Sequence, residues 1–555
     1  MSPNCPVLRR FLSFLRKASS GSHFWAVAAI VWLTICAADA QVNQFPLGGL
    51  AVYNVPQESP PLELSGLSDT VTLAWPAAAS NFVVESSSDL VSGVWTRETN
   101  AVIDVVGGQT IATVALASDQ RFYRLHGPQV YLVPIFQFAI FYNNLLEFTW
   151  SATFTVNGRV HANGDIFVGS PSPLTFNSVV TTAGQIYKTN WDGHTVAQMT
   201  GAVTYLGTPG WMTNVSHLSL PVGTNSTPAA TREILYQPPA GEDPTSWVGE
   251  QRYFSKAGVV LLVSNTTVTA SFKNSPTDVP ISLNVTNWGT NSISLSTTFP
   301  FLSVTNSFID QRELSKTVRP TQIDVGLYGQ WLATNSAVMT KFPTGSGFFP
   351  NVLYVADNRT IATNFDLFAV RLVNGSILPT NGTPGAPTGW TVATPNPLYV
   401  QGHYNLGPGG STTPGNTDTS ATYPASLVSD AFTILSGNWI DANSSGSLGF
   451  RPAVNTTVNA AILTGIVYST DGTSNHFSGG VQNVTRLLED WSGDTLTLNT
   501  SIVNLFDSAR ATNWFRNPGA YYFAPARKFN FDTNFTFATK LPPATPSLTL
   551  VVTPE

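Results

Sequence analysis

The stretch VNGRVHANGDIFVGS, residues 156–170, could be either a small active site or a tightly turned sheet. It contains His161 and Asp165 among valines, an isoleucine and two Asn-Gly pairs. In an extended segment a separation of four residues spans about 13 Å, so the two side chains meet only if the turn between them folds them back. A turn with a polar cap is the simpler explanation. We therefore predict that His161 and Asp165 shape a bend in a sheet and are neither catalytic residues nor metal ligands.

The residues around this bend extend the predicted sheet. The Asn-Gly pairs at 157–158 and 163–164 are expected to turn the chain between short strands. Residues 182–188 (TAGQIYK) are expected to form the next layer. The side chains expected to point into the core are those of Phe154, Val156, Val160, Ile166 and Val168.

Four later segments predict further layers of the same kind. They are short apolar strands at 397–402, 431–437, 459–469 and 496–506. Their starting points lie roughly 28 to 37 residues apart, a spacing that suits the rungs of a parallel β-solenoid carrying loops. A large part of the chain is thus expected to stack strand on strand.

The middle of the chain predicts a different local structure. Segments 258–272, 280–288 and 292–299 are expected to be antiparallel strands of an inserted sheet. Helix is expected in only two places. The first is 321–334, with Asp324 in its first turn and Ile323, Leu327, Trp331 and Leu332 on one face, and the second is 484–491.

The first 40 residues are predicted to be a cleaved export signal. Basic residues precede an apolar run at 24–38, which is shorter than the roughly 18 residues that a membrane-spanning helix needs. Small residues at Ala38 and Ala40 predict cleavage after Ala40 and export by the general secretory route. The alternative is an uncleaved anchor. If the leader is removed, the mature chain is expected to have no transmembrane helix.

Composition indicates a β-rich protein held together by apolar packing. Charged residues make up only 10% of the chain, whereas Gly and Pro are frequent, at 43 and 38 residues. Both cysteines, Cys5 and Cys36, lie in the leader, so no disulfide is expected in the mature chain. The formal net charge is -6, and no basic stretch follows the leader, which argues against nucleic-acid binding.

Residues 68–127 are predicted to form a small β-sandwich. Apolar residues alternate along its expected strands, and the module resembles the fibronectin-type-III-like modules of secreted bacterial proteins. The resemblance rests on Trp75-Pro76 and on the closing strand at 122–125 (FYRL). Trp75 and Trp95 are expected in its core. Residues 41–67, rich in Pro and Gly, are expected to be a linker.

Residues of about 128–550 resemble secreted bacterial proteins described as pilus-assembly-protein-X-like. The resemblance rests on FQFAIFYNN (136–144), TVNGRVHANGDIFVG (155–169), SFIDQRE (307–313), FSGGVQNVTRLLEDWSG (477–493) and PARKFNFDTNF (525–535), in this order. It implies an exported, surface or pilus-associated β-rich protein, with no catalytic residues to carry over. A prepilin cleavage motif does not precede the apolar segment, which argues against assembly into a pilus.

Several acidic and basic residues lie close together in the sequence, and structural roles explain them better than catalysis does. Glu489, Asp490 and Asp494 surround Trp491, an arrangement that would suit a glycosidase, but Arg486 is within i,i+4 pairing reach of Asp490, which favours a helix end. Two further mixed clusters are expected to form ion pairs: Asp310 with Arg312, Glu313 and Lys316, and Arg527-Lys528 with Asp532.

The remaining motifs support neither metal nor nucleophilic chemistry. His194, His217, His403 and His476 lack ligand spacing, and residues 415–420 (GNTDTS) lack the acids of a calcium loop. We therefore predict no catalytic, cofactor-binding or metal-binding residues and no cofactor.

The sequence as a whole predicts an all-β protein. A small N-terminal sandwich is followed by a large β-rich domain at 128–555, partly a parallel β-solenoid, with one or two short helices. The expected function is that of a secreted, non-catalytic structural or adhesive protein of the cell surface, with a surface glycan or protein as partner. The alternative is a carbohydrate-binding protein or a β-helix polysaccharide hydrolase or lyase.

Overall fold

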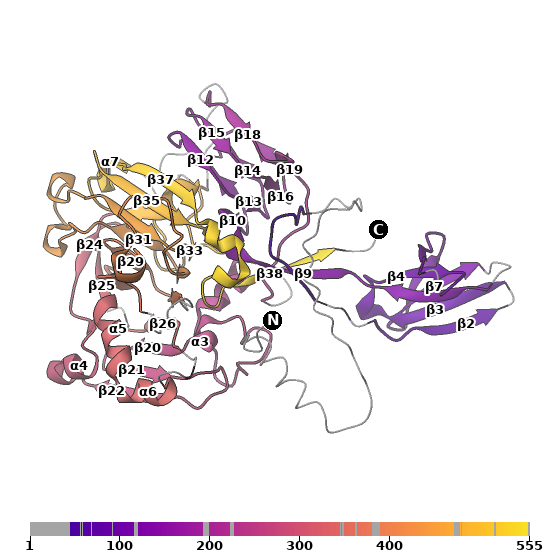
Figure 1. Cartoon of the computed structure of the whole chain (residues 1–555), viewed down its shortest axis with the longest axis horizontal. Helices are drawn as coiled ribbons and strands as arrows, with labels where there is room; N and C mark the ends of the chain where they lie inside the picture. The colour runs from indigo at the N-terminus through magenta and orange to yellow at the C-terminus, as the bar shows by residue number, and fades with distance from the viewer. Residues whose placement is uncertain are drawn as a thin grey trace. The chain divides into compact units, whose positions relative to one another are not determined.

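The computed structural model describes residues 45–552 with short gaps at 56, 58, 68, 91–92, 116–119, 192–198, 223–226, 344–345, 347–348, 361–362, 380–388, 471–477, 479 and 515–517. The predicted leader, including both cysteines, lies outside the described residues. Within these ranges, no helix has the length and apolarity to cross a membrane. The structure is built mainly of strands, as predicted (Figure 1).

The N-terminal module is a two-sheet antiparallel sandwich. One sheet has the order β2 (Glu63–Leu67), β3 (Thr70–Pro76), β7 (Gln109–Ala115), β6 (Val102–Val106), and the other has β5 (Thr96–Arg97), β4 (Val83–Ser87), β8 (Phe122–His126). Trp75 is buried in its core and donates its indole N–H to the carbonyl of Ala79 at 3.0 Å. Trp95 is only half-buried, under the Arg124 guanidinium at 4.3 Å, so its placement in the core was wrong.

The predicted linker is largely structured. Phe45 is buried, and β1 (Tyr53–Val55) pairs with β9 (Gln129–Pro134), the strand that follows the sandwich. On its other side β9 pairs with β38 (Ser547–Val552), near the end of the chain. A three-stranded antiparallel sheet thus joins segments from both sides of the sandwich to the C-terminal strand.

Residues 140–212 form an N-terminal stack of short parallel strands. The first three layers each contribute one strand to each of three sheets, and one sheet has a further strand, β19. Along that sheet, equivalent residues of the first three layers are 20 positions apart, as in Ile140, Val160 and Val180. The sheets have the orders β10-β13-β16-β19, β11-β14-β17 and β12-β15-β18. Their bounds are β10 (Ile140–Tyr142), β11 (Leu146–Glu147), β12 (Phe154–Val156), β13 (Val160–Ala162), β14 (Ile166–Phe167), β15 (Leu174–Phe176), β16 (Val180–Thr182), β17 (Ile186–Tyr187), β18 (Val203–Tyr205) and β19 (Trp211–Met212).

The C-terminal stack also consists of parallel strands, with longer connections. One sheet runs β20 (Val259–Val263), β26 (Val352–Asp357), β28 (Trp390–Ala393), β30 (Ala425–Ser429), β33 (Ala461–Thr464), β36 (Ile502–Asn504). A second runs β25 (Lys316–Asp324), β27 (Asp366–Val373), β29 (Leu398–Gln401), β31 (Phe432–Leu435), β34 (Thr485–Leu487), and a third β32 (Thr456–Asn459), β35 (Thr495–Thr500), β37 (Ala526–Phe531).

The two stacks meet through a parallel strand pair. β10, the first strand of the N-terminal stack, pairs with β36, so one continuous sheet of twelve strands passes through both stacks. The all-β prediction is confirmed, and 397–402, 431–437, 459–469 and 496–506 each contain a strand of a parallel ladder. That the large domain is a parallel β-solenoid stays a prediction.

The antiparallel insert is confirmed for two of its three predicted strands. β20 pairs with β21 (Thr267–Phe272), which pairs with β22 (Ile281–Thr286). The third, at 292–299, was wrong because this segment is helix α4 (Ser292–Thr298). Leu295 is buried there whereas Ile293 is 80% exposed, which an alternating strand would not allow.

Both predicted helices need correction. Residues 321–324 belong to strand β25, and the helix α5 (Val325–Thr334) begins after Asp324, whose carboxylate caps it by accepting from the Leu327 N–H at 2.9 Å. Leu327 is 41% exposed, so it does not share the buried face. The segment 484–491 contains strand β34 and no helix, because Thr485–Leu487 pairs with β31 and the buried Arg486 is held by Glu313 from a distant part of the chain.

The corners of the N-terminal stack explain its Asn-Gly pairs. Gly158 and Gly164 do not have positive φ, contrary to the tight hairpin-type turn that the pairs suggested. A Cβ on Gly164 would instead lie 2.8 Å from the carbonyl carbon of Asn144, one layer away. These positions need glycine because adjacent layers approach closely.

Polar side chains bond between layers as well as within them. The Asn177 amide donates to Asn157 Oδ1 at 2.7 Å, and the Asn499 amide donates to Asn459 Oδ1 at 2.7 Å. The Phe176 and Tyr205 rings stack with centroids 5.3 Å apart. The layers are therefore joined by side-chain ladders in addition to backbone pairing.

Candidate ligand-binding site

His161 is enclosed by apolar and polar neighbours in the core of the N-terminal stack. It lies on β13, fully buried, with the rings of Phe45, Phe138 and Phe141 within 6.0 Å of its own. Its Nε2 is 3.0 Å from Asn163 Oδ1, which can only accept, so the ring donates there. Its Nδ1 is 2.9 Å from the Thr181 hydroxyl. Burial lowers the pKa of His161 to about 4, so the ring is neutral at pH 7.

Asp165 bonds to the backbone of the next layer. Its carboxylate accepts the Gln185 backbone N–H of the next layer at 2.8 Å. In the described structure no hydrogen bond or ion pair joins it to His161. Of the predicted inward side chains, Val156, Val160, Ile166 and Val168 are buried and Phe154 is half-buried.

The acidic cluster at 489–494 does not converge on a cleft. Glu489 is fully buried, and Ser436 donates both its backbone N–H and its hydroxyl to the carboxylate, each at 2.6 Å. Burial raises the pKa of Glu489 to about 7. Asp490 instead accepts the Ser492 N–H at 3.0 Å. Trp491 is fully buried and presents no face to a sugar.

Arg486 does not pair with Asp490, because residues 485–487 are a strand and the helical i,i+4 spacing is absent. Its guanidinium instead bonds the buried carboxylate of Glu313 and the Ala511 carbonyl, the latter at 2.6 Å. Tyr399 donates its hydroxyl to the nearby Asp310 at 2.6 Å. Burial, and then the Glu313 carboxylate, raise the pKa of Asp310. This buried polar network connects β24 (Phe308–Asp310), β29 and β34.

The other singled-out residues have separate local partners. The Arg527 guanidinium lies 3.2 Å from the Tyr522 hydroxyl, whereas Asp532 accepts from the Thr419 hydroxyl at 2.6 Å. His403 accepts the Thr457 N–H at 3.1 Å. His194 and His476 lie outside the described residues. Within the described ranges, no three His, Cys, Asp or Glu side chains gather where they could hold a metal ion.

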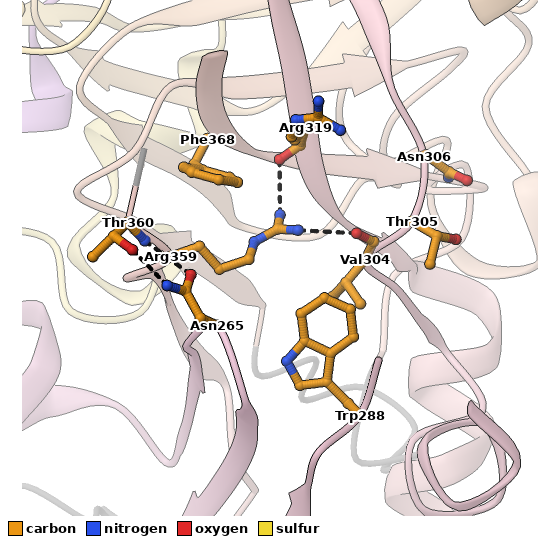
Figure 2. A pocket seen from close by; sticks show the side chains of 9 residues that line it. All are labelled: Asn265, Trp288, Val304, Thr305, Asn306, Arg319, Arg359, Thr360 and Phe368. Carbon is orange, nitrogen blue, oxygen red and sulfur yellow. Dashed lines mark hydrogen bonds between the residues drawn. The ribbon is translucent and has the colours of Figure 1, made fainter. Parts of the chain in front are cut away.

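A pocket of about 540 Å³ lies where several loops of the C-terminal stack meet (Figure 2). β20 and β26 are parallel, with Val263 opposite Asp357, so both strands end at the same edge. The segments that follow them contribute Asn265, Arg359 and Thr360. The rest of the lining is Trp288 after β22, Val304, Thr305 and Asn306 after β23 (Leu302–Ser303), Arg319 on β25 and Phe368 on β27.

Arg359 holds together the chain segments that form the walls of this pocket. Its guanidinium forms a two-pronged ion pair with Asp357, at 2.6 and 2.9 Å, and lies 4.5 Å from the centre of the Phe368 ring. It also donates to the carbonyls of Val304, at 2.9 Å, and Arg319, at 2.8 Å (Figure 2). One buried cation thus ties together three chain segments.

The pocket walls combine one large ring with neutral polar groups. Trp288 is half-buried, and its indole N–H donates to the Ser264 carbonyl at 2.9 Å, which fixes the ring. Asn265 and Thr360 bond reciprocally, at 3.0 Å through the Thr360 N–H and 2.5 Å through its hydroxyl. In Figure 2, this pair lies to the left of the Arg359 guanidinium, and Trp288 lies below it and to the right. Such a mixture is common in pockets that bind small organic groups.

Sequence reasoning did not find this pocket. Its residues come from connections spread between 265 and 368, and no short motif joins them. The one local signal is Asp357-Asn-Arg359 at the end of an apolar strand, which places an acid and a guanidinium together where a parallel strand leaves its sheet.

No family model, curated protein or solved structure matches the chain. The resemblance to pilus-assembly-protein-X-like proteins therefore stays an expectation from the sequence. Function has to be argued from the geometry of the chain itself.

Proposed function

We propose that this chain is a secreted, non-catalytic adhesive protein whose β scaffold presents the Trp288 pocket to a ligand outside the cell. The observation that carries the proposal is the set of contacts that Arg359 makes with three segments around the pocket. A guanidinium with its donors bonded to Asp357, Val304 and Arg319 holds the pocket walls in place before any ligand arrives. Preformed walls reduce the ordering cost of binding.

The buried acids and His161 support a scaffold role. Glu489, Asp310 and Glu313 each bond to side chains on neighbouring strands or loops, and His161 bonds within and between layers. These groups hold elements of the stacks together. A secreted location is proposed from the leader sequence, and binding is proposed from the pocket.

Adhesion of the purified chain tests this proposal. Wells coated with cellulose, mucin or collagen would be probed with the chain and with Trp288→Ala. A matched control is Trp247→Ala, which removes a 64% exposed indole outside the pocket. We expect adhesion to at least one coating that Trp288→Ala loses and Trp247→Ala keeps. Equal adhesion by all three proteins would overturn the role of the pocket.

A polysaccharide hydrolase or lyase is the second candidate. It follows from the sequence, where the acids around Trp491 suit a glycosidase, but Glu489 is fully buried against Ser436 and has no access to a substrate, so this candidate ranks below the adhesive one. Product release from polysaccharides would be followed with the chain, Glu489→Gln and Asp494→Asn. We expect no turnover. Turnover that disappears in either variant would replace the adhesive proposal with an enzymatic one.

A further inference from the structure

We propose that the Trp288 pocket binds an uncharged saccharide, with one sugar ring stacked on the indole face. This inference rests on the proposed function and names the ligand class of the same site. Three properties of the described residues carry it: compensated charge, a fixed aromatic face, and neutral hydrogen-bonding groups around that face.

The charges that line the pocket are compensated within the protein. Arg359 pairs with Asp357, and Arg319 pairs with Asp366 at 2.8 Å. Among the residues that the structure describes, no other charged side chain lines the pocket. Figure 2 shows the Arg319 guanidinium directed away from Trp288, with its backbone carbonyl turned toward Arg359. A carboxylate or phosphate ligand would therefore find no unpaired cation beside the indole.

The indole is held in one orientation. Its only polar atom is occupied by the bond to the Ser264 carbonyl, so what it offers a ligand is its apolar face. The face of an aromatic ring is electron-rich and attracts the positively polarised C–H bonds on one side of a pyranose. A fixed ring loses little side-chain entropy when such a ligand stacks on it.

The neutral polar groups that line the pocket with the indole both donate and accept. The Thr360 hydroxyl accepts from Asn265 and keeps its own hydrogen, and the Asn265 amide keeps a second N–H. Thr305 is exposed, and in the described structure its hydroxyl has no bonding partner. Sugar hydroxyls also donate and accept, so these neutral groups complement them better than they complement an ion.

Calorimetric titration tests the inference. Cellohexaose, mannohexaose, xylohexaose and chitohexaose would be the uncharged probes and hexagalacturonate the charged one. We expect at least one uncharged hexamer to bind the chain and Trp247→Ala equally, and Trp288→Ala roughly tenfold or more weakly, a change of about 1.4 kcal/mol. Trp288→Phe should retain most of the binding, and thermal melts of all variants should coincide with that of the parent chain.

The outcomes separate this inference from the proposed function. Stronger binding of hexagalacturonate than of every uncharged hexamer would overturn the neutral-sugar inference. Failure of all uncharged hexamers to bind would overturn it too, even if adhesion to mucin or collagen still depended on Trp288. In both cases the adhesive function would stand. If, in addition, Trp288→Ala adhered to every coating as well as the parent chain does, both the neutral-sugar inference and the proposed adhesive role of the pocket would be overturned.

Discussion

Glu489 is fully buried with both carboxylate oxygens bonded to Ser436, one to the backbone N–H and one to the hydroxyl. The contact joins the end of β31 to the segment after β34, so it belongs to the stacking of layers. Burial nevertheless raises the pKa of the carboxyl, so its ionisation opposes folding near neutral pH.

We expect Glu489→Gln to become more stable relative to the parent chain as the pH rises. The folded pKa of about 7 lies above the ordinary value of 4.5, so between these values the folded state binds more protons and the parent loses stability with rising pH. The difference should grow by about 3 kcal/mol from pH 4.5 to 7, at 1.36 kcal/mol per pKa unit. Urea unfolding at several pH values measures it.

The control for Glu489→Gln is Glu63→Gln, which makes the same replacement at an exposed carboxylate and so measures the effects common to any Glu→Gln change. A pH-independent difference for Glu489→Gln would mean that the carboxyl titrates normally in the folded protein.

His161 should produce the opposite pH dependence. Its folded pKa of about 4 lies below the ordinary 6.5, so the unfolded chain binds more protons and stability falls as the pH drops between these values. His161→Phe should remove about 3 kcal/mol of this acid sensitivity, because phenylalanine cannot protonate among the surrounding rings. Unfolding at pH 7 and pH 4 checks this. If both proteins lose the same stability at pH 4, His161 is not the group responsible.

Gly164→Ala should destabilise the N-terminal stack. The added Cβ would lie 2.8 Å from the Asn144 carbonyl carbon, and backbone atoms of the adjacent layer cannot move without disturbing the strand ladder. We expect a loss of about 1–3 kcal/mol in the free energy of unfolding. Gly449→Ala is the control, since its Cβ would meet nothing within 4 Å, and it should change stability by no more than about 0.5 kcal/mol. Equal effects would contradict close layer contact at this corner.

Arg486→Met should cost about 3–5 kcal/mol, because it removes the ion-pair partner of the buried Glu313 carboxylate, which lies beside Asp310. The comparison is Arg319→Met, which breaks an ion pair whose arginine is 48% exposed and should cost no more than about 1 kcal/mol. Chemical denaturation of both variants gives the two values. A small loss for Arg486→Met would show that the other groups beside Glu313, which include the Asn513 amide at 2.9 Å and the buried Arg312, are enough to satisfy this acid.

The sequence predicted the strands better than it predicted the helices. The predicted inward residues Val160 and Ile166 are buried on β13 and β14, and this was predictable because apolar residues between turn formers indicate short strands without knowledge of the fold. The 20-residue recurrence of Ile140, Val160 and Val180 was not predicted. Segment 292–299 is too short to distinguish alternation from helical periodicity, since Leu295 and Phe299 share a helical face as well. At 484–491 the strand buries Arg486, and only its distant partner Glu313 makes this burial possible, so there was no local sign of a strand in the sequence.

The pocket could not be predicted for a different reason. Trp288 and Arg359 are neighbours only because β22 pairs with β21, β21 with β20, and β20 with β26. No spacing in the sequence encodes that chain of pairings. Arg486 was likewise assigned to Asp490 when its partner, Glu313, lies 173 residues away.

The pairing of β10 with β36 has a consequence for how the chain folds during its synthesis. Asn143, just after β10, donates to the carbonyl of Leu505, 362 residues later. At translation rates of about 5–20 residues per second, the partner strand is made roughly 20–70 s after β10 itself. Throughout this interval the edge of the nascent strand remains open to pairing with other chains, so a chaperone that shields it during biosynthesis should raise the yield of native protein.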